Sequence, residues 1–114
     1  MTCNYCDKEN ARKQAFEEIW ANDINEVFAD VASYYNRINS FASLGMLDAW
    51  RRRFIDTIEI KPNDRVLDVC AGTNVIGIDL LKKQPDLEVY AVDRSAEMQE
   101  VGKEDAESLG FNIN

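Results

Sequence analysis

The chain of 114 residues has room for one ordinary domain, and its apolar (46%) and charged (30%) fractions are those of a soluble globular protein. Its net charge of −8 repels phosphate backbones and anionic lipid, so we expect neither nucleic acid nor a lipid surface as the main partner. No stretch approaches the roughly 20 apolar residues of a membrane span, and the N-terminus has no apolar signal core. We therefore expect a cytoplasmic protein with no membrane span.

The residue types that are missing or scarce limit the chemistry. The sequence contains no histidine, which is the commonest general base and the commonest metal ligand. Any reaction must therefore rest on carboxylates, tyrosines, cysteines or a bound cofactor. The three cysteines are an odd number, which argues against a disulfide framework.

The first part of the chain predicts helices. In an N-terminal arm, residues 1–22, apolar residues share one helix face: Ala11, Ala15, Phe16, Ile19 and Trp20. Asp23 is expected to cap a second helix, which starts a cap or lid region over residues 23–60. The apolar stripe of that second helix is Ile24, Val27, Phe28, Val31 and Tyr35.

The rest of the lid region contains a predicted loop and a third helix. Residues 36–45 are rich in polar and small residues, which predicts a loop with a short turn of helix. The stripe of the third helix is Leu47, Trp50, Phe54 and Ile58, with a run of three arginines beside it at 51–53. Such a run is typical of a solvated helix face; docking to an acidic partner or a polar substrate group is the alternative.

The periodicity changes at residue 61, where Pro62 and its neighbours predict a turn. Residues 65–70 form a short, nearly continuous apolar run with two β-branched valines, as expected of a buried parallel strand. A small-residue turn, a helix over 75–83 and a second strand over 87–92 follow. Ser95 is expected to cap a last helix that ends at Gly110, and residues 111–114 begin a third strand.

This order predicts the α/β class: N-terminal helices followed by the first βαβαβ part of a Rossmann-like parallel sheet. Residues 61–114 would form the first half of a nucleoside-binding domain. A complete sheet of this kind has more strands, so we expect the domain to be incomplete in this chain.

The strongest site signal joins the first strand to the second. A strand that runs into a glycine-containing turn and then a helix N-terminus brings backbone N–H groups close to a ligand, and Gly72 occupies that turn. Asp93 follows about 20 residues later at the tip of the second strand, where a carboxylate can accept ribose hydroxyls. A plain turn with a solvated aspartate is the alternative.

The stretch 66–74, Val-Leu-Asp-Val-Cys-Ala-Gly-Thr-Asn, resembles motif I (D-x-G-x-G-x-G) of the class I S-adenosylmethionine-dependent methyltransferases. The segment from Tyr35 to Trp50 resembles the UbiE/COQ5 quinone and menaquinone C-methyltransferases, whose pattern runs Y-D-x-M-N, then a serine, then His-x-x-Trp. The resemblance covers residues 26–114 and implies S-adenosylmethionine as cofactor, with a quinol-like or other activated aromatic carbon as methyl acceptor.

The resemblance also implies roles for individual residues. Gly72 and Thr73 would approach the methionine and ribose portion of the cofactor, Asp93 would hold the ribose diol, and Arg94 would lie beside the adenine. Asp68 would anchor the turn or reach the cofactor's amino group through water. The N-terminal lid over the cofactor would contain Tyr35 and Asn39, and the alternative for Tyr35 is packing on a helix face. No catalytic residue is assigned.

Four residues depart from the family pattern. Cys70 and Asn74 stand where glycine is usual, Leu47 replaces the histidine, and Asn36 replaces the aspartate. A side chain at Asn74 could crowd the cofactor, although asparagine tolerates the left-handed backbone of such a turn.

The pair Cys3 and Cys6 has the C-x-x-C spacing of half a metal site. An incidental pair, a site completed by another chain and a redox pair all fit this spacing. We assign no metal site within this chain.

A domain that stops within its third strand leads us to expect a complementary chain that carries the remaining strands. The chain would then be the N-terminal subunit of a split, heteromeric methyltransferase, with a fragment of a longer protein as the other possibility. A non-catalytic subunit that binds the cofactor, or a scaffold that regulates a partner methyltransferase, is the alternative function.

Overall fold

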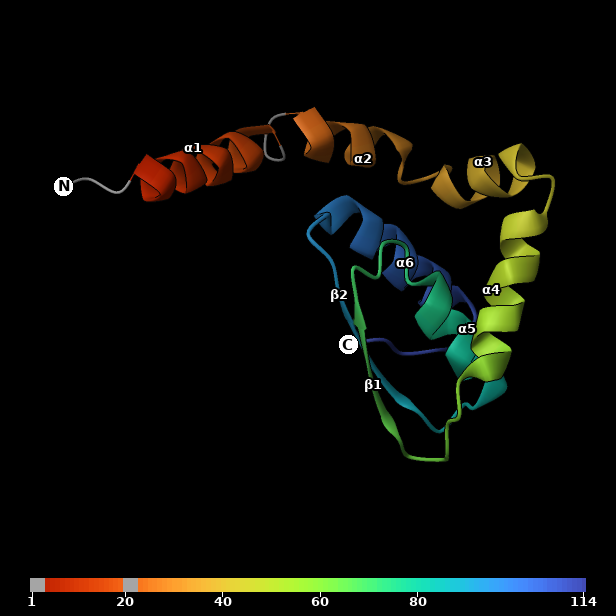
Figure 1. Cartoon of the computed structure of the whole chain (residues 1–114). Helices are drawn as coiled ribbons and strands as arrows, with labels where there is room; N and C mark the ends of the chain where they lie inside the picture. Colours follow the sequence, from red (N-terminus) through yellow and green to blue (C-terminus); the bar gives the residue numbers. More distant parts are fainter. Residues whose placement is uncertain (1–3, 20–22) are drawn as a thin grey trace.

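The structure is a computed structural model that describes residues 4–19 and 23–114 (Figure 1). Within these ranges the first elements are helices: α1 (Asn4–Ile19), α2 (Asn25–Val31), α3 (Tyr35–Ala42) and α4 (Met46–Thr57). Strands and helices then alternate: β1 (Arg65–Val69), α5 (Val75–Lys83), β2 (Glu88–Val92) and α6 (Ala96–Ser108). This order confirms the predicted α/β class. The predictions for Cys3 and Trp20 lie outside the described residues.

Helix α1 contributes little to the core. In Figure 1 it extends away from the strands, and α2 connects it to the rest of the molecule. Two residues of its predicted apolar face, Phe16 and Ile19, are 57% and 50% exposed. An apolar face with so few neighbours contributes little to folding stability. Among the residues that the structure describes, no helix is long and apolar enough to cross a bilayer.

The connection between α2 and α4 differs from the prediction in two ways. Asp23 is not the cap of α2: Ile24 holds the N-cap position and makes no side-chain cap bond. The predicted loop over 36–45 is largely helix α3. Tertiary contacts explain this, because Asn36 accepts a hydrogen bond from Thr73 and Ser40 donates one to Asp48. These bonds stabilise a segment whose own helix propensity is low.

The two strands pair in parallel, with Val66 opposite Val89 and Asp68 opposite Ala91. Helices α4, α5 and α6 lie to one side of the strands in Figure 1. The core forms on that side from five buried residues: Ile55, Leu80, Leu81, Leu87 and Val89. The Lys83 ammonium group donates to the carbonyl oxygens of Ile55 and Ile58, both at 2.9 Å, and so satisfies two carbonyls at the end of α4.

The opposite face of the sheet is exposed, and it is apolar toward the carboxyl ends of the two strands. Leu67 and Val69 of β1 are each 64% exposed, and Val92 of β2 is 54% exposed. The prediction of a buried first strand is therefore wrong for one of its two faces. A parallel strand has both faces buried only where other elements cover both. Among the described residues, no helix covers this face.

The last helix ends as predicted, and the third strand is only partly formed. Gly110 has a φ of 77°, and the N–H groups of Gly110 and Phe111 donate to the carbonyls of Glu107 and Ala106, which is a Schellman motif. Residues 111–114 do not form a regular strand. The Asn114 backbone nevertheless pairs with β2. Its N–H donates to the carbonyl of Val89 at 2.9 Å, and its carbonyl oxygen accepts from the N–H of Ala91 at 2.8 Å.

Candidate functional site

The turn after β1 has an unusual backbone. Cys70, Gly72 and Asn74 have φ values of 62°, 54° and 59°, in the left-handed region. Asn74 is the N-cap residue of α5 and is buried. The turn therefore accommodates asparagine in place of glycine, as expected from asparagine's tolerance of this conformation.

Asp93 joins this turn to the end of β2. Its Oδ2 accepts a hydrogen bond from the N–H of Gly72 at 2.7 Å, and its Oδ1 accepts one from the N–H of Ser95 at 2.9 Å. Ser95 caps α6 as predicted, because its hydroxyl oxygen accepts from the N–H of Met98. Hydrogen bonds to an ionised carboxylate are stronger than neutral ones. The two strand ends are thus held together by one carboxylate.

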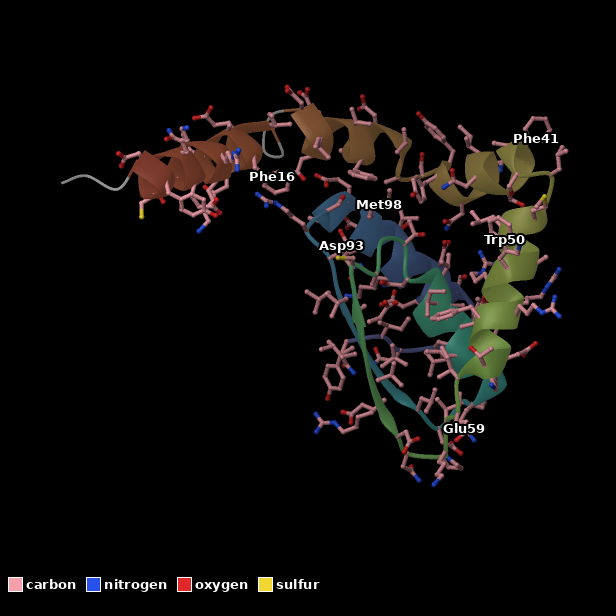
Figure 2. All side chains as sticks on the ribbon, in the orientation of Figure 1. Phe16, Phe41, Trp50, Glu59, Asp93 and Met98 are labelled. Carbon is pink, nitrogen blue, oxygen red and sulfur yellow. The ribbon has the colours of Figure 1, made fainter. Side chains whose placement is uncertain are left out.

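A cavity of about 400 Å³ opens beside this carboxylate. Its lining comes from the strand ends, from the start of α6 and from helices α1, α2 and α3: Phe16, Phe28, Tyr35, Cys70, Gly72, Asp93, Arg94, Ser95 and Met98. Figure 2 shows Phe16, Asp93 and Met98 close to one another where the N-terminal helices pass the strand ends. The Phe28 and Tyr35 rings are 6.3 Å apart, centroid to centroid. The cavity thus combines aromatic walls with one acidic group.

Asp68 lies on β1 next to this cluster. Its Oδ2 is buried and has no hydrogen-bond partner. Burial, and then the nearby Asp93 carboxylate, raise the pKa of Asp68. A buried acceptor without a donor costs free energy, which a ligand N–H group or ammonium group would recover. The arrangement fits a cofactor that brings a positive charge and hydrogen-bond donors.

The residues predicted from the resemblance divide into two groups. Gly72, Asp93, Arg94 and Tyr35 line the same cavity. The other three do not line it: Thr73 is 2% exposed and donates to Asn36, Asn39 lines a separate cavity of about 360 Å³, and Asp68 is half-buried on β1. Tyr35 lines both cavities.

Several residues that build this site have no site signal in the sequence. Phe16 and Phe28 fall in the apolar stripes of helices, and no local pattern marks them as cavity walls. Gln99 and Gly102 of α6 contact the turn itself and were not singled out. Gly102 offered a signal, because glycine inside a helix costs about 1 kcal/mol and points to close packing.

The cysteine pair and the arginine run do not form a second candidate site in the described residues. Cys6 is exposed, and the described residues contain no group of three or more potential metal ligands. In the arginine run, Arg51 contacts Asp79 (2.7 Å) and Asp48 (3.1 Å), whereas its two neighbours are exposed. Arg51 therefore stabilises the packing of α4 on α5.

Comparison with known proteins agrees with this geometry. The sequence model of the ubiE/COQ5 methyltransferase family matches residues 13–114. The ubiquinone/menaquinone biosynthesis C-methyltransferase UbiE of Xanthomonas oryzae is 39% identical over 102 residues, which are 84% of this chain and 40% of that protein. UbiE of Geotalea daltonii is 34% identical over 94 residues, 80% of this chain and 40% of the relative.

A third relative has a related name. The demethylmenaquinone methyltransferase of Lactobacillus johnsonii is 34% identical over 80 residues, 57% of this chain and 33% of that protein. The chain thus spans about 40% of the length of the UbiE relatives that it matches. With the family model matching residues 13–114, the chain belongs to the UbiE/COQ5 methyltransferase family.

Proposed function

We propose that the chain is the cofactor-binding N-terminal part of an S-adenosylmethionine-dependent methyltransferase. The observation that carries the proposal is the Asp93 carboxylate, which holds the Gly72 turn at 2.7 Å and lines an aromatic-walled cavity. A carboxylate at the end of the second strand, beside a glycine turn, is the arrangement that recognises the ribose of a nucleoside cofactor.

Each side chain around the cavity has a proposed task. Asp93 accepts the ribose hydroxyls with the lone pairs that its two backbone bonds leave available. Arg94 borders the adenine, and Gly72 gives the cofactor close access to the backbone. Asp68, which does not line the cavity, anchors the turn or reaches the cofactor's amino group through water, which would supply the donor that its buried Oδ2 lacks.

Tyr35 and Asn39 contribute to the site from the lid, and Thr73 connects the turn to the lid. Thr73 connects the turn to α3 through its bond to Asn36. Tyr35 lines the cofactor cavity and Asn39 lines the adjacent one. The lid would exclude water from the transferring group and hold the reactants in line, which is the main contribution that an enzyme can make to such a transfer.

The acceptor is proposed from the relatives, which are named as ubiquinone/menaquinone and demethylmenaquinone methyltransferases. When bound, the cofactor supplies an electrophilic methyl group on a sulfonium, which an activated aromatic carbon can attack. A quinol-like ring is therefore the proposed acceptor.

We also propose that a complementary polypeptide completes the sheet. The exposed face of Leu67, Val69 and Val92 is apolar, and apolar sheet faces are stable only when covered. The chain matches about 40% of the length of its UbiE relatives, and their remaining length is sufficient to supply further strands and helices. The complete pocket would then form only in the assembled protein.

The test is a calorimetric titration of S-adenosylmethionine into this chain, alone and mixed with a polypeptide that corresponds to the remaining part of a UbiE relative. Binding that tightens at least tenfold in the mixture, with methyl transfer to a demethylmenaquinol analogue, supports the methyltransferase. Equal binding in both samples without transfer supports a non-catalytic binding subunit. Asn74 and Leu47, which depart from the family pattern, are the reason to consider that alternative. Absence of binding in both samples contradicts the proposal.

A further inference from the structure

Helix α6 contacts the turn through one amide side chain. The Nε2 of Gln99 donates to the carbonyl oxygen of Gly72 at 2.7 Å and to the Oδ1 of Asn74 at 2.9 Å. Gln99 lies 25 residues beyond Asn74 and one helical turn before Gly102. One side chain thus bonds both the backbone and a side chain of the same turn.

The second contact is steric. A Cβ placed on Gly102 would lie 2.6 Å from the carbonyl carbon of Thr73 and 2.8 Å from Cγ of Asn74. The absence of a side chain at this position lets α6 approach the turn closely. The Asn74 side chain therefore lies between the turn and α6, and it does not line the cavity of about 400 Å³.

Asn74 needs such a restraint for a physical reason. It has a left-handed backbone, occupies a position that is usually glycine in motif I, and carries a polar side chain into a buried environment. A buried carboxamide without partners destabilises the folded chain. Without Gln99, the Asn74 carboxamide would lose its hydrogen-bond partner and be free to turn toward the cavity that Gly72 of the same turn lines.

We propose that Gln99 is a positioning residue for the cofactor turn: its amide holds the Asn74 side chain against α6 and so keeps the cavity open for the cofactor. This rests on the proposed function for the identity of the ligand. We call this contact between Gln99 and Asn74 the Gln99 clamp. It explains how a chain with asparagine at a glycine position retains room for a nucleoside. It also predicts that binding depends much less on Gln99 once residue 74 has no side chain, because only the bond to the Gly72 carbonyl then remains.

The test uses the full chain, with the completing polypeptide if the chain alone binds too weakly, and four proteins: wild type, Gln99→Leu, Asn74→Gly and the double variant. The dissociation constant for S-adenosylmethionine should rise about tenfold in Gln99→Leu, corresponding to one or two lost hydrogen bonds. Asn74→Gly should bind like wild type, and the double variant within about threefold of it. Glu100→Leu, an exposed neighbour on α6, is the matched control.

A structural role alone would lower the melting temperature without this pattern of rescue. A double variant as weak as Gln99→Leu would overturn the proposal. A nuclear Overhauser cross-peak between the Gln99 amide protons and Asn74 is expected with no cofactor present, and its absence would also overturn the clamp. If the cross-peak is present and no sample binds S-adenosylmethionine, the clamp stands as a structural feature, and both its positioning role and the proposed function fail.

Discussion

Gly102 lies against the backbone of Thr73, so that a Cβ on Gly102 would come within 2.6 Å of the Thr73 carbonyl carbon. Such a distance forces the helix or the turn to move. Gly102→Ala should therefore lower the unfolding free energy by about 1–3 kcal/mol, despite the better helix propensity of alanine. Urea denaturation measures this.

Gly77 provides the matched control for this substitution. It is also a buried helical glycine, but its Cβ would meet only side-chain atoms, Val89 Cγ1 at 3.1 Å and Ile113 Cδ1 at 3.2 Å. Side chains can move by a few tenths of an ångström, so Gly77→Ala should cost less than Gly102→Ala. Equal costs would contradict the close approach of α6 to the turn.

Asp93→Ala removes the acceptor for the N–H groups of Gly72 and Ser95 and the proposed ribose ligand. Hydrogen bonds to a charged group contribute about 1.5–3 kcal/mol, so affinity for S-adenosylmethionine should fall about 10- to 100-fold. Calorimetry on the assembled protein measures this. Asp86→Ala, at an exposed position before β2, should bind as wild type does. An unchanged affinity in Asp93→Ala would exclude Asp93 from the site.

Asp68 should make stability depend on pH. Burial and Asp93 raise its pKa in the folded state, so the folded chain retains this proton at pH values where the unfolded chain has lost it. The wild-type unfolding free energy should therefore fall as pH rises from about 4, the ordinary aspartate value, through the raised pKa. Asp68→Asn removes this loss, so its advantage over wild type should grow over that range and then level off.

Urea denaturation at a series of pH values measures the difference between Asp68→Asn and wild type. Asp105→Asn, at an exposed position of α6, controls for the loss of one negative charge. A stability difference between Asp68→Asn and wild type that does not change with pH would show that Asp68 is not perturbed in the folded chain.

The Arg51–Asp79 pair should stabilise the packing of α4 on α5. Arg51 contacts Asp79 at 2.7 Å, and the two side chains are 26% and 17% exposed. Arg51→Met keeps most of the aliphatic stem and removes the charge, so we expect a loss of about 1 kcal/mol that diminishes with added salt. Arg52→Met, at an exposed neighbour, should leave the unfolding free energy unchanged. Equal effects of the two variants would refute the assignment.

Local signals in the sequence predict β1, α5, β2 and α6, the elements after residue 61. Ser95 caps α6, and Gly110 closes it, because both features depend on residues within one turn of the helix end. The two strands lie within one residue of their predicted bounds. Asp93 could be placed near Gly72 because the carboxyl ends of neighbouring parallel strands meet at one edge of the sheet.

Contacts between distant segments were not predictable in this way. Phe16 lines the cavity with Asp93, 77 positions further along the chain, and no local pattern indicates that approach. The polar and small residues of α3 predict a loop with a short turn of helix, whereas bonds to Thr73 and Asp48 stabilise a helix there. The Gln99 clamp depends on how α6 packs on the turn, which the periodicity of α6 does not specify.

The central claim is that the Asp93–Gly72 turn binds S-adenosylmethionine, and the most direct test is a cofactor titration of the isotopically labelled chain followed by NMR. The N–H groups of Gly72 and Ser95 both donate to Asp93, so their signals should shift saturably in wild type and not in Asp93→Ala. Signals of Gly72 and Ser95 that stay unchanged at millimolar cofactor, with and without the completing polypeptide, would contradict the claim.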